Sequence, residues 1–297
     1  MDSLNVYLTT FLLGTTLVII FTVSLLKWRK VKTKTYNECR DKNCVRCTKY
    51  LETKTLAVSR FDDYIKEKSP KDKRALERIK SSTSNIDYTD TNKRQNPSVF
   101  FMQGLSSHPW PSHLTSAIEH DRTVLEQNTQ VIYSELMKII DVNIDGWIIN
   151  NTPSGQWTVF HLVNQGKIIG KNVSVVPNTY KIVNSLLSAM GNCVFGNVAF
   201  SVIYPGTIIT EHFGPTNIRL RCHLGLSISP LCSITVDGHK QSWKYGKTLV
   251  FDDSYLHGVE YAQTANEEMR AVLLVDMWHP DISEEEMKAL RIMFENK

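Results

Sequence analysis

The chain has 297 residues, of which 42% are apolar and 22% charged. This length suits one large domain or two small ones, and the composition can build a packed core, which excludes a chain disordered by composition. With 34 basic and 30 acidic residues, the net charge of +4 excludes a nucleic-acid-binding function based on bulk charge. Six cysteines are too few for a disulfide scaffold. The mean hydropathy of −0.22 excludes many membrane spans but allows one.

An uncharged run covers residues 3–26. A helix of this length, at about 1.5 Å per residue, crosses the ~30 Å hydrocarbon layer with some tilt. Residues 27–30 (KWRK) end the run with basic and aromatic side chains that suit the headgroup layer. A cleaved signal peptide is the alternative, but Asp2 is the only charged residue before the run, which also exceeds the usual length of a signal peptide's apolar region. We therefore predict an uncleaved single-pass transmembrane anchor in residues 1–30.

The side of the membrane on which the remaining chain lies stays open. All the basic residues that flank the anchor follow it, between Lys27 and Lys34, which places the C-terminal part in the cytosol by the positive-inside tendency. Glycosylation sequons at Asn150 and Asn172 could be used only by a lumenal domain. The two signals therefore point to opposite sides.

Residues 31–97 are predicted to form a stalk and linker. Three cysteines form a C-x4-C-x2-C cluster: Cys39, Cys44 and Cys47. We interpret them as juxtamembrane thiols or local disulfides rather than a metal site, because no fourth ligand is evident nearby. Residues 61–80 are predicted to form a charged, solvated helix, and residues 81–97 read as a polar, turn-rich linker.

From Ser98 onward the pattern changes to that of a packed domain. Apolar residues recur every three or four positions over residues 113–140, which predicts one long helix with a buried face that includes Leu136, Ile139 and Ile140. Short strands are predicted within residues 147–160, and a second helix over residues 181–191.

Beyond Asn197 nearly every segment alternates like a β-strand. Gly, Pro, Asp and Asn separate these short segments, a hairpin is expected at Asp237-Gly238, and only residues 283–294 predict a closing helix. Many short strands with such turns indicate a sandwich or jelly roll. We therefore predict a mainly β domain over residues 98–297, in which flanking helices pack on a double-sheet core.

Two histidines stand at the ends of predicted strands. His212 ends the strand TIITE, and His257 follows the strand TLVFDD after a short turn. Two imidazoles at strand ends could hold a first-row metal and leave several coordination positions open. The alternative is that each is an ordinary hydrogen-bonded polar residue.

Between these histidines, the segment IRLRCHLGL predicts a strand with charged residues on one face. A period of two puts Arg219, Arg221 and His223 on the same side, where they are costly in an apolar core unless they bind something. A carboxylate-bearing ligand is one partner, because arginine offers a bidentate fork. Internal ion pairs with Asp252 or Asp253 are the other.

Three stretches carry a family resemblance: PGTIITEHFGPTNIRLRCHLGLSI, SWKYGKTLVFDDSYLHGVEY and MRAVLLVDMWHP. They resemble the aspartyl/asparaginyl β-hydroxylase family, and within it the short membrane-anchored aspartate β-hydroxylase domain-containing proteins. The resemblance covers roughly residues 98–281, with GLSSHPW and GQWTVF as weaker markers. It implies a double-stranded β-helix (jelly-roll, cupin-like) core.

The resemblance implies that His212 and His257 are catalytic iron ligands. Many oxygenases of the wider class add a carboxylate two residues after the first histidine, and here that position is Gly214. This departure is typical of the family, and water can fill the vacant position. Five other histidines are not expected to be ligands: His108, His113, His120, His239 and His279.

The resemblance also implies a set of cosubstrate-binding residues. Arg221 and His223 match residues that contact 2-oxoglutarate at its metal-binding end. Ser201 and Arg270 match those that hold its distal carboxylate, and Trp157 matches an aromatic that lines the pocket.

The implied activity is that of a dioxygenase that uses Fe(II), 2-oxoglutarate and O2 to hydroxylate a C–H bond, at Cβ of Asp or Asn in a polypeptide. Free amino acids and proline-type substrates are also compatible with the resemblance. The alternative is a catalytically silent, membrane-tethered binding or scaffold protein with the same fold. The expected setting is an internal membrane, the endoplasmic reticulum, reached through residues 3–26, with no nucleic-acid partner.

Overall fold

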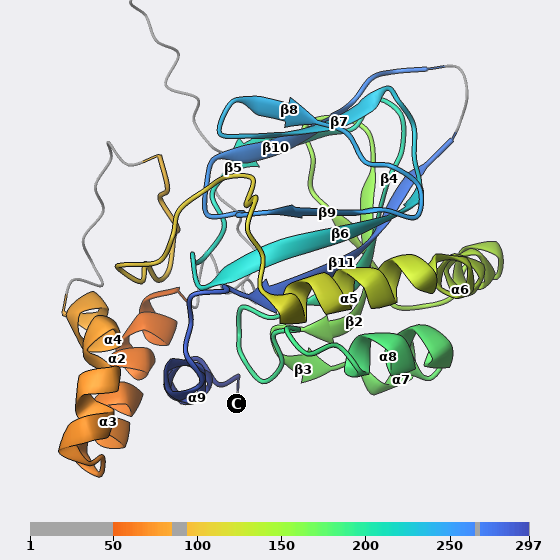
Figure 1. Cartoon of the computed structure of the whole chain (residues 1–297). Helices are drawn as coiled ribbons and strands as arrows, with labels where there is room; N and C mark the ends of the chain where they lie inside the picture. The colour runs from red at the N-terminus through yellow and green to blue at the C-terminus, as the bar shows by residue number, and fades with distance from the viewer. Residues whose placement is uncertain (1–49, 85–93, 265–267, 297) are drawn as a thin grey trace, which may run out of the picture. The chain divides into compact units, whose positions relative to one another are not determined.

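The computed structural model describes residues 50–84, 94–264 and 268–296 (Figure 1). The predicted anchor in residues 1–30 and the cysteine cluster lie outside these ranges, so both stay predictions. Among the described residues, no helix is both long and apolar enough to cross a membrane.

Two antiparallel sheets form the centre of the described chain, so the prediction of a mainly β fold with a double-sheet core is confirmed. The larger sheet has the strand order β1-β2-β4-β11-β6-β9, with β3 added beside β2. Its strands are β1 (Trp147–Asn150), β2 (Trp157–Asn164), β3 (Lys167–Ile168), β4 (Val198–Ile203), β6 (Arg219–Ser227), β9 (Thr248–Phe251) and β11 (Arg270–Trp278). The smaller sheet has the order β5-β10-β7-β8. Its strands are β5 (Ile208–His212), β7 (Cys232–Val236), β8 (His239–Gln241) and β10 (His257–Tyr261).

The strands read from sequence alternation are found where they were predicted. The β7–β8 hairpin turns at Asp237 and Gly238, whose φ angles of 50° and 77° are both in the left-handed region that an Asp-Gly pair tolerates. This confirms the predicted hairpin.

Each face of the larger sheet has a different cover, as Figure 1 shows. Helices α5 (Ser116–Gln127), α6 (Thr129–Asp141) and α8 (Pro177–Asn184) pack on one face through a hydrophobic cluster that includes Leu136, Phe160 and Phe200. The smaller sheet faces the other side, and a second cluster with Ile203, Phe251 and others fills the space between the two sheets. The inner face of the larger sheet is therefore where an enclosed site can form.

The helix predicted over residues 113–140 is two helices, α5 and α6, that meet at Asn128. The Asn128 side chain donates a hydrogen bond to the carbonyl oxygen of Val124, 2.8 Å away, and the backbone at Asn128 leaves the helical region. Leu136 and Ile139 are buried as predicted, while Ile140 is only partly buried.

The helix predicted over residues 181–191 was placed wrongly, because α8 ends at Asn184. Pro177 begins the helix, as proline favours the first helical position. After its end, the buried Asp121 carboxylate accepts the backbone N–H groups of Leu187 and Ser188, at 2.9 and 2.7 Å. These long-range hydrogen bonds hold the segment in a non-helical path.

The solvated helix predicted over residues 61–80 is also corrected. The structure has three helices here: α2 (Tyr50–Lys66), α3 (Pro70–Ala75) and α4 (Glu77–Thr83). Their apolar residues pack with the C-terminal helix α9 (Glu284–Met293) in a third cluster, which contains Ala57, Phe61, Leu76 and Ile79. Burial of this apolar stripe makes α2–α4 part of the packed structure.

Arg78 links three segments of this region through its guanidinium. Its guanidinium pairs with Glu286, with an Nη2–Oε2 distance of 2.7 Å, and donates to the carbonyl oxygens of Gly104 and Asp281. Glu286 also completes the capping box with Ser283 at the start of α9. One arginine therefore joins α4, the loop near Gly104 and the first turn of α9.

The two sequons differ in accessibility. Asn172 lies in α7 (Gly170–Val173), is 3% exposed and donates its amide N–H to the His161 carbonyl oxygen at 2.7 Å. Asn150, at the end of β1, is only partly buried. In the folded protein the Asn172 side chain is therefore structural.

Substitution of Phe61 by alanine in the full chain tests the docking of α2. Phe61 is 1% exposed, so we expect a loss of about 3–5 kcal/mol in the free energy of unfolding, measured by denaturant titration. Leu56→Ala is the matched control on the same helix, because Leu56 is 42% exposed and its loss costs about 0.5 kcal/mol or less. Equal unfolding midpoints for the two variants would contradict the docking of α2.

Candidate active site

His212 and His257 lie side by side in the smaller sheet. They are paired residues of β5 and β10, and their ring centroids are 4.2 Å apart. In each ring Nδ1 lies close to the carbonyl oxygen two residues earlier, at 2.8 Å from Thr210 O and 2.9 Å from Tyr255 O. A carbonyl only accepts, so Nδ1 carries the proton and the Nε2 lone pair is the one able to bind a metal. In each ring Nε2 is therefore the nitrogen that could bind a metal.

At residue 214, where many oxygenases have a carboxylate ligand, there is no space for a side chain. A Cβ added at Gly214 would lie 2.7 Å from the carboxyl carbon and the backbone oxygen of Asp253. The Gly214 N–H also donates to the Asp253 carbonyl oxygen at 2.7 Å. Only glycine fits this close approach, so residue 214 cannot contribute a carboxylate.

The donor set at this point is thus two imidazoles. Across the described ranges, no group of three or more His, Cys, Asp or Glu side chains could hold a metal ion. Neutral imidazole suits first-row divalent metals, including Fe(II), and two such ligands leave most coordination positions to other ligands. The residues present fit a metal that binds a chelating small molecule in the same site.

The other predicted site residues lie on the inner face of the larger sheet. Trp157 and Arg270 both pair with Ile203 on β4, and Ser201 lies two residues before Ile203 on the same face. The Trp157 Nε1–H donates to Ser201 Oγ at 3.1 Å, and an Arg270 Nη1–H donates to the Ser201 carbonyl oxygen at 3.3 Å. These three residues therefore form one group.

Arg270 is a buried cation without a carboxylate partner in the described part of the chain. It is 1% exposed, its Nε has no hydrogen-bond partner, and its neighbours are the Ser201 carbonyl, the Cys232 thiol and the face of Trp243. Burial lowers the pKa of its guanidinium. An isolated buried charge is costly unless it is paired, so this group favours an anionic ligand.

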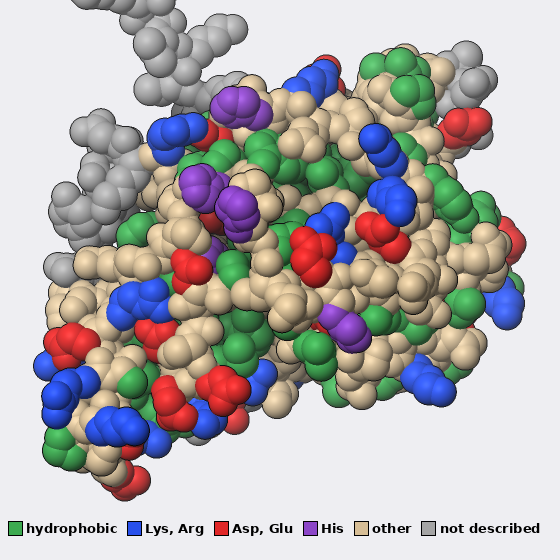
Figure 2. Space-filling view, viewed as in Figure 1, with side chains coloured by type: hydrophobic (Ala, Val, Ile, Leu, Met, Phe, Trp, Pro, Cys, Tyr) green, Lys and Arg blue, Asp and Glu red, His purple; other side chains and the backbone are tan. Residues whose placement is uncertain are grey.

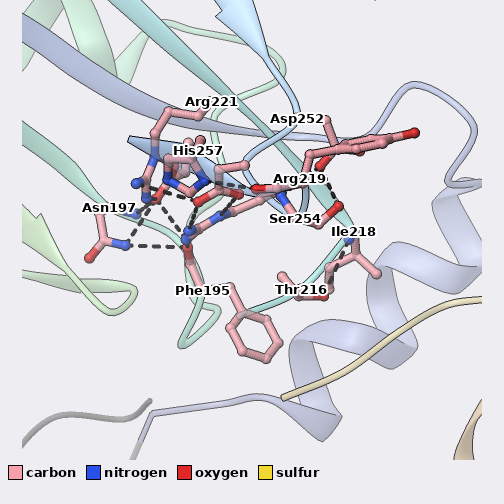
Figure 3. A network of polar contacts seen from close by, with 12 residues as sticks. Phe195, Asn197, Thr216, Ile218, Arg219, Arg221, Asp252, Ser254 and His257 are labelled. Carbon is pink, nitrogen blue, oxygen red and sulfur yellow. Dashed lines mark hydrogen bonds and ion pairs between the residues drawn. The ribbon is translucent and has the colours of Figure 1, made fainter. Parts of the chain in front are cut away.

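Arg219 and Arg221, in contrast, are already paired, as Figure 3 shows. Arg219 contacts Asp253 and Asp276, with an Nη1–Asp276 Oδ2 distance of 3.0 Å. Arg221 Nε lies 2.8 Å from Asp276 Oδ1, and its Nη1 lies 3.4 Å from Asp253 Oδ2. Of the two partners considered from sequence, Asp253 forms ion pairs, and Asp252 forms none with the residues that the structure describes. The third carboxylate, Asp276, was missed. The cluster holds two positive and two negative groups.

This charge cluster fixes the ionisation of Asp253. Burial alone would raise the pKa of its carboxyl, but the Arg219 and Arg221 guanidiniums lower that pKa well below its usual range. Asp253 is therefore ionised at any physiological pH. Arg221 retains 17% side-chain exposure, whereas Arg219 retains 3%, so Arg221 is the member that can also contact a ligand.

His223 lies between the charge cluster and the histidine pair. Its ring contacts Phe251 edge-on at 5.1 Å between centroids, and Phe251 in turn contacts His257 at 6.0 Å. Burial, and then the Arg270 and Arg221 charges, lower the pKa of His223 well below its usual value. The imidazole is therefore neutral at physiological pH.

Five of the other histidines do not join this group, whereas His161 lies on β2 on the same face as Trp157 and interacts electrostatically with Asp276 and Arg221. On the face seen in Figure 2, histidine side chains lie among interspersed acidic and basic ones. Both ring nitrogens of His279 have backbone partners, the Ser106 carbonyl and the Asp281 N–H. Four others have exposed side chains: His108, His113, His120 and His239.

Comparison with known proteins assigns the chain to a family. A family profile described as "Aspartyl/Asparaginyl beta-hydroxylase" matches residues 126–280. Aspartate beta-hydroxylase domain-containing protein 2 of Homo sapiens is 39% identical over 271 residues, which cover 87% of this chain and 71% of that protein. The chain belongs to the aspartyl/asparaginyl beta-hydroxylase family.

More distant matches were also found. The protein named aspartyl/asparaginyl beta-hydroxylase of Mus musculus is 31% identical over 65% of this chain and 26% of its own length. A solved structure described as an oxidoreductase of the 2OG-Fe(II) oxygenase family, from Burkholderia pseudomallei, is 10% identical and covers 59% of this chain and 97% of its own, with a TM-score of 0.35.

In this beta-hydroxylase family member, all the predicted site residues face the space between the two sheets. The histidine pair lies on the smaller sheet, and the larger sheet contributes the others: Trp157, Ser201, Arg221, His223 and Arg270. Their assigned roles stay predictions. Two residues of the site were missed, Trp243 and Asp276. Alternate residues of a strand share a face, so Asp276 lies on the same face of β11 as Arg270. The sequence alternation could therefore have identified Asp276.

Gly214→Ala tests the steric limit in this beta-hydroxylase family member. We expect a loss of about 1–3 kcal/mol in unfolding free energy, because the new methyl would displace Asp253. Gly170→Ala is the matched control, since nothing lies within 4 Å of a Cβ added there. If both variants melt at the same temperature as the unaltered protein, the close approach of Asp253 to residue 214 is wrong.

Asp252 gives a pH prediction. It is buried, accepts hydrogen bonds from Ser254 and Gln95, and burial raises its pKa to about 7. Because the unfolded chain ionises near the ordinary pKa, the protonated folded form stabilises the protein at low pH, and this contribution is lost as pH rises toward 7. We expect the unaltered protein to lose about 2–3 kcal/mol relative to Asp252→Asn between pH 5 and pH 8, by denaturant titration. Parallel pH profiles would refute the assignment.

Proposed function

We propose that this protein is an Fe(II)- and 2-oxoglutarate-dependent dioxygenase that hydroxylates Cβ of Asp or Asn in a polypeptide. The observation that carries the proposal is a buried guanidinium without a carboxylate partner in the described chain, Arg270, in a site that also holds two imidazoles whose Nε2 nitrogens could bind a metal. Arg270 would bind one carboxylate of a dicarboxylate ligand, and the two imidazoles would bind the iron. Membership of the family supports the choice of Asp or Asn.

His212 and His257 would hold the iron, which when bound supplies the redox chemistry that activates O2. Arg270, with Ser201 and Trp157 beside it, would bind the distal carboxylate of 2-oxoglutarate. The buried guanidinium gains its counter-charge only from the ligand, so binding of a dicarboxylate is favoured over that of a monocarboxylate.

His223 and Arg221 would contact the 2-oxo acid end. Because its imidazole is neutral, His223 can donate one hydrogen bond without adding charge beside the metal. The net reaction balances as 2-oxoglutarate, O2 and R–H giving succinate, CO2 and R–OH. The enclosed position between two sheets would exclude bulk water from the reacting carbon.

We further propose the setting of this activity. The two-sheet core would be a double-stranded β-helix (jelly roll) within a hydroxylase domain of residues 98–297. Residues 31–97, whose helices α2–α4 pack on α9, would connect this domain to a single-pass anchor in residues 1–30 at an internal membrane, the endoplasmic reticulum. The uncharged run at residues 3–26 supports the anchor.

The test follows succinate formation by the full-length chain supplied with Fe(II), ascorbate and 2-oxoglutarate. We expect turnover in the unaltered protein and a loss of roughly a hundredfold or more in Arg270→Ala, since a buried charged contact is removed. A double His212→Ala/His257→Ala variant should be inactive. Arg291→Ala is the control, because Arg291 lies over Trp278, outside the site.

The outcomes separate the two functions. Unchanged turnover in Arg270→Ala would overturn the cosubstrate pocket. Absence of both succinate and 2-oxoglutarate binding in the unaltered chain would overturn the oxygenase proposal and favour a binding or scaffold protein with the same fold.

A further inference from the structure

Trp243 lies in the loop between β8 and β9, and its side chain packs between the two sheets. It is 3% exposed and belongs to the inter-sheet cluster with Ile203, Phe251 and Val272. Its indole contacts two side chains of the site, His223 and Arg270, in two different ways.

The indole N–H fixes the proton of His223. Trp243 Nε1 lies 3.2 Å from His223 Nδ1, and an indole N–H can only donate. His223 Nδ1 must therefore accept, so the proton of the neutral ring is on Nε2. That Nε2 is buried and has no partner among the described residues, which leaves its N–H as a donor for a ligand.

The indole ring supports Arg270. The guanidinium carbon of Arg270 lies 4.6 Å from the centre of the Trp243 ring, within the range of a cation–π contact. The same ring stacks beside His223, with 6.0 Å between centroids and an interplanar angle of 22°. Because the Arg270 Nε has no partner in the described chain, the aromatic face is a main constraint on where the guanidinium sits.

We propose that Trp243 is the positioning residue for both ends of the cosubstrate. Its N–H holds His223 as the Nε2-protonated tautomer for the 2-oxo acid end, and its face holds Arg270 for the distal carboxylate. This inference rests on the proposed function and adds to it a residue that touches no reacting atom.

Two substitutions separate the contacts. Trp243→Phe removes the N–H and keeps an aromatic face under Arg270, whereas Trp243→Leu removes both. Trp278→Phe is the matched control, because Trp278 is also 3% exposed and has Arg291 over its ring at 5.6 Å, but lies in the cluster beside α9. Thermal melting of each full-length variant shows whether it is folded.

Binding is measured by calorimetry with Mn(II) and two probes. The first probe is 2-oxoglutarate, and the second is 2-oxobutyrate, which keeps the 2-oxo acid end and lacks the distal carboxylate. We expect Trp243→Phe to weaken both probes roughly tenfold, the effect of one misplaced hydrogen bond. Trp243→Leu should weaken 2-oxoglutarate by about a further fivefold, the effect of a lost cation–π contact, and leave 2-oxobutyrate at the Trp243→Phe level.

The tautomer of His223 is read independently by nitrogen NMR of ¹⁵N-histidine-labelled full-length protein, with His223→Gln to assign the signal. We expect a protonated Nε2 and an unprotonated Nδ1 in the unaltered protein and in Trp278→Phe. Protonation at Nδ1 in the unaltered protein would overturn the proposal, as would unweakened 2-oxoglutarate binding by Trp243→Phe.

The two proposals fail in different ways. If the unaltered protein binds no 2-oxoglutarate, the proposed function is refuted, and the His223 tautomer still decides whether Trp243 fixes that ring. If Trp243→Leu does not fold, Trp243→Phe and the tautomer decide the outcome.

Discussion

Four buried charges connect the two loops that carry the candidate metal ligands to the larger sheet. Asp253 stands four residues before His257, pairs with Arg219 and Arg221, and accepts the backbone N–H of Gly214, two residues after His212. Asp276, from the neighbouring strand β11, completes the cluster. Because removal of one partner from a buried pair costs about 3–5 kcal/mol, the positions of both histidine loops are coupled to this cluster.

The buried arginines of the site differ in whether a carboxylate balances their charge. Arg219 and Arg221 balance the charges of Asp253 and Asp276. These four side chains can therefore keep their arrangement when no ligand is bound. Arg270 has no such balance within the described residues and sits against a carbonyl, a thiol and an indole face. Arg219 and Arg221 therefore stabilise the fold through charges that are already paired, while the charge of Arg270 is available for binding. The difference lies in the partners, since Arg219 and Arg270 are both buried.

Much of this arrangement was predictable from local patterns. Alternation located the strands, and a period of two correctly grouped Arg219, Arg221 and His223 on one face. Two of the failures depended on contacts between distant parts of the chain. The helix end at Asn184 depends on Asp121, 63 residues earlier, and the burial of α2 depends on α9 at the opposite end of the described chain. Trp243 lies in a loop with no periodicity, so nothing local placed it beside His223.

In a lumenal domain, the buried amide of Asn172 would make the order of folding and glycosylation matter. Its N–H bonds to the carbonyl oxygen of His161 on β2, and its Oδ1 occupies the space beside Gly146, so a sugar attached there has no room in the native structure. A chain entering the secretory pathway would reach this fold only where closure of α7 over β2 outpaces the glycosyltransferase at that sequon. Folding and glycosylation would then compete at the sequon Asn-Val-Ser. The fraction of chains glycosylated at Asn172 would measure how fast α7 packs on β2.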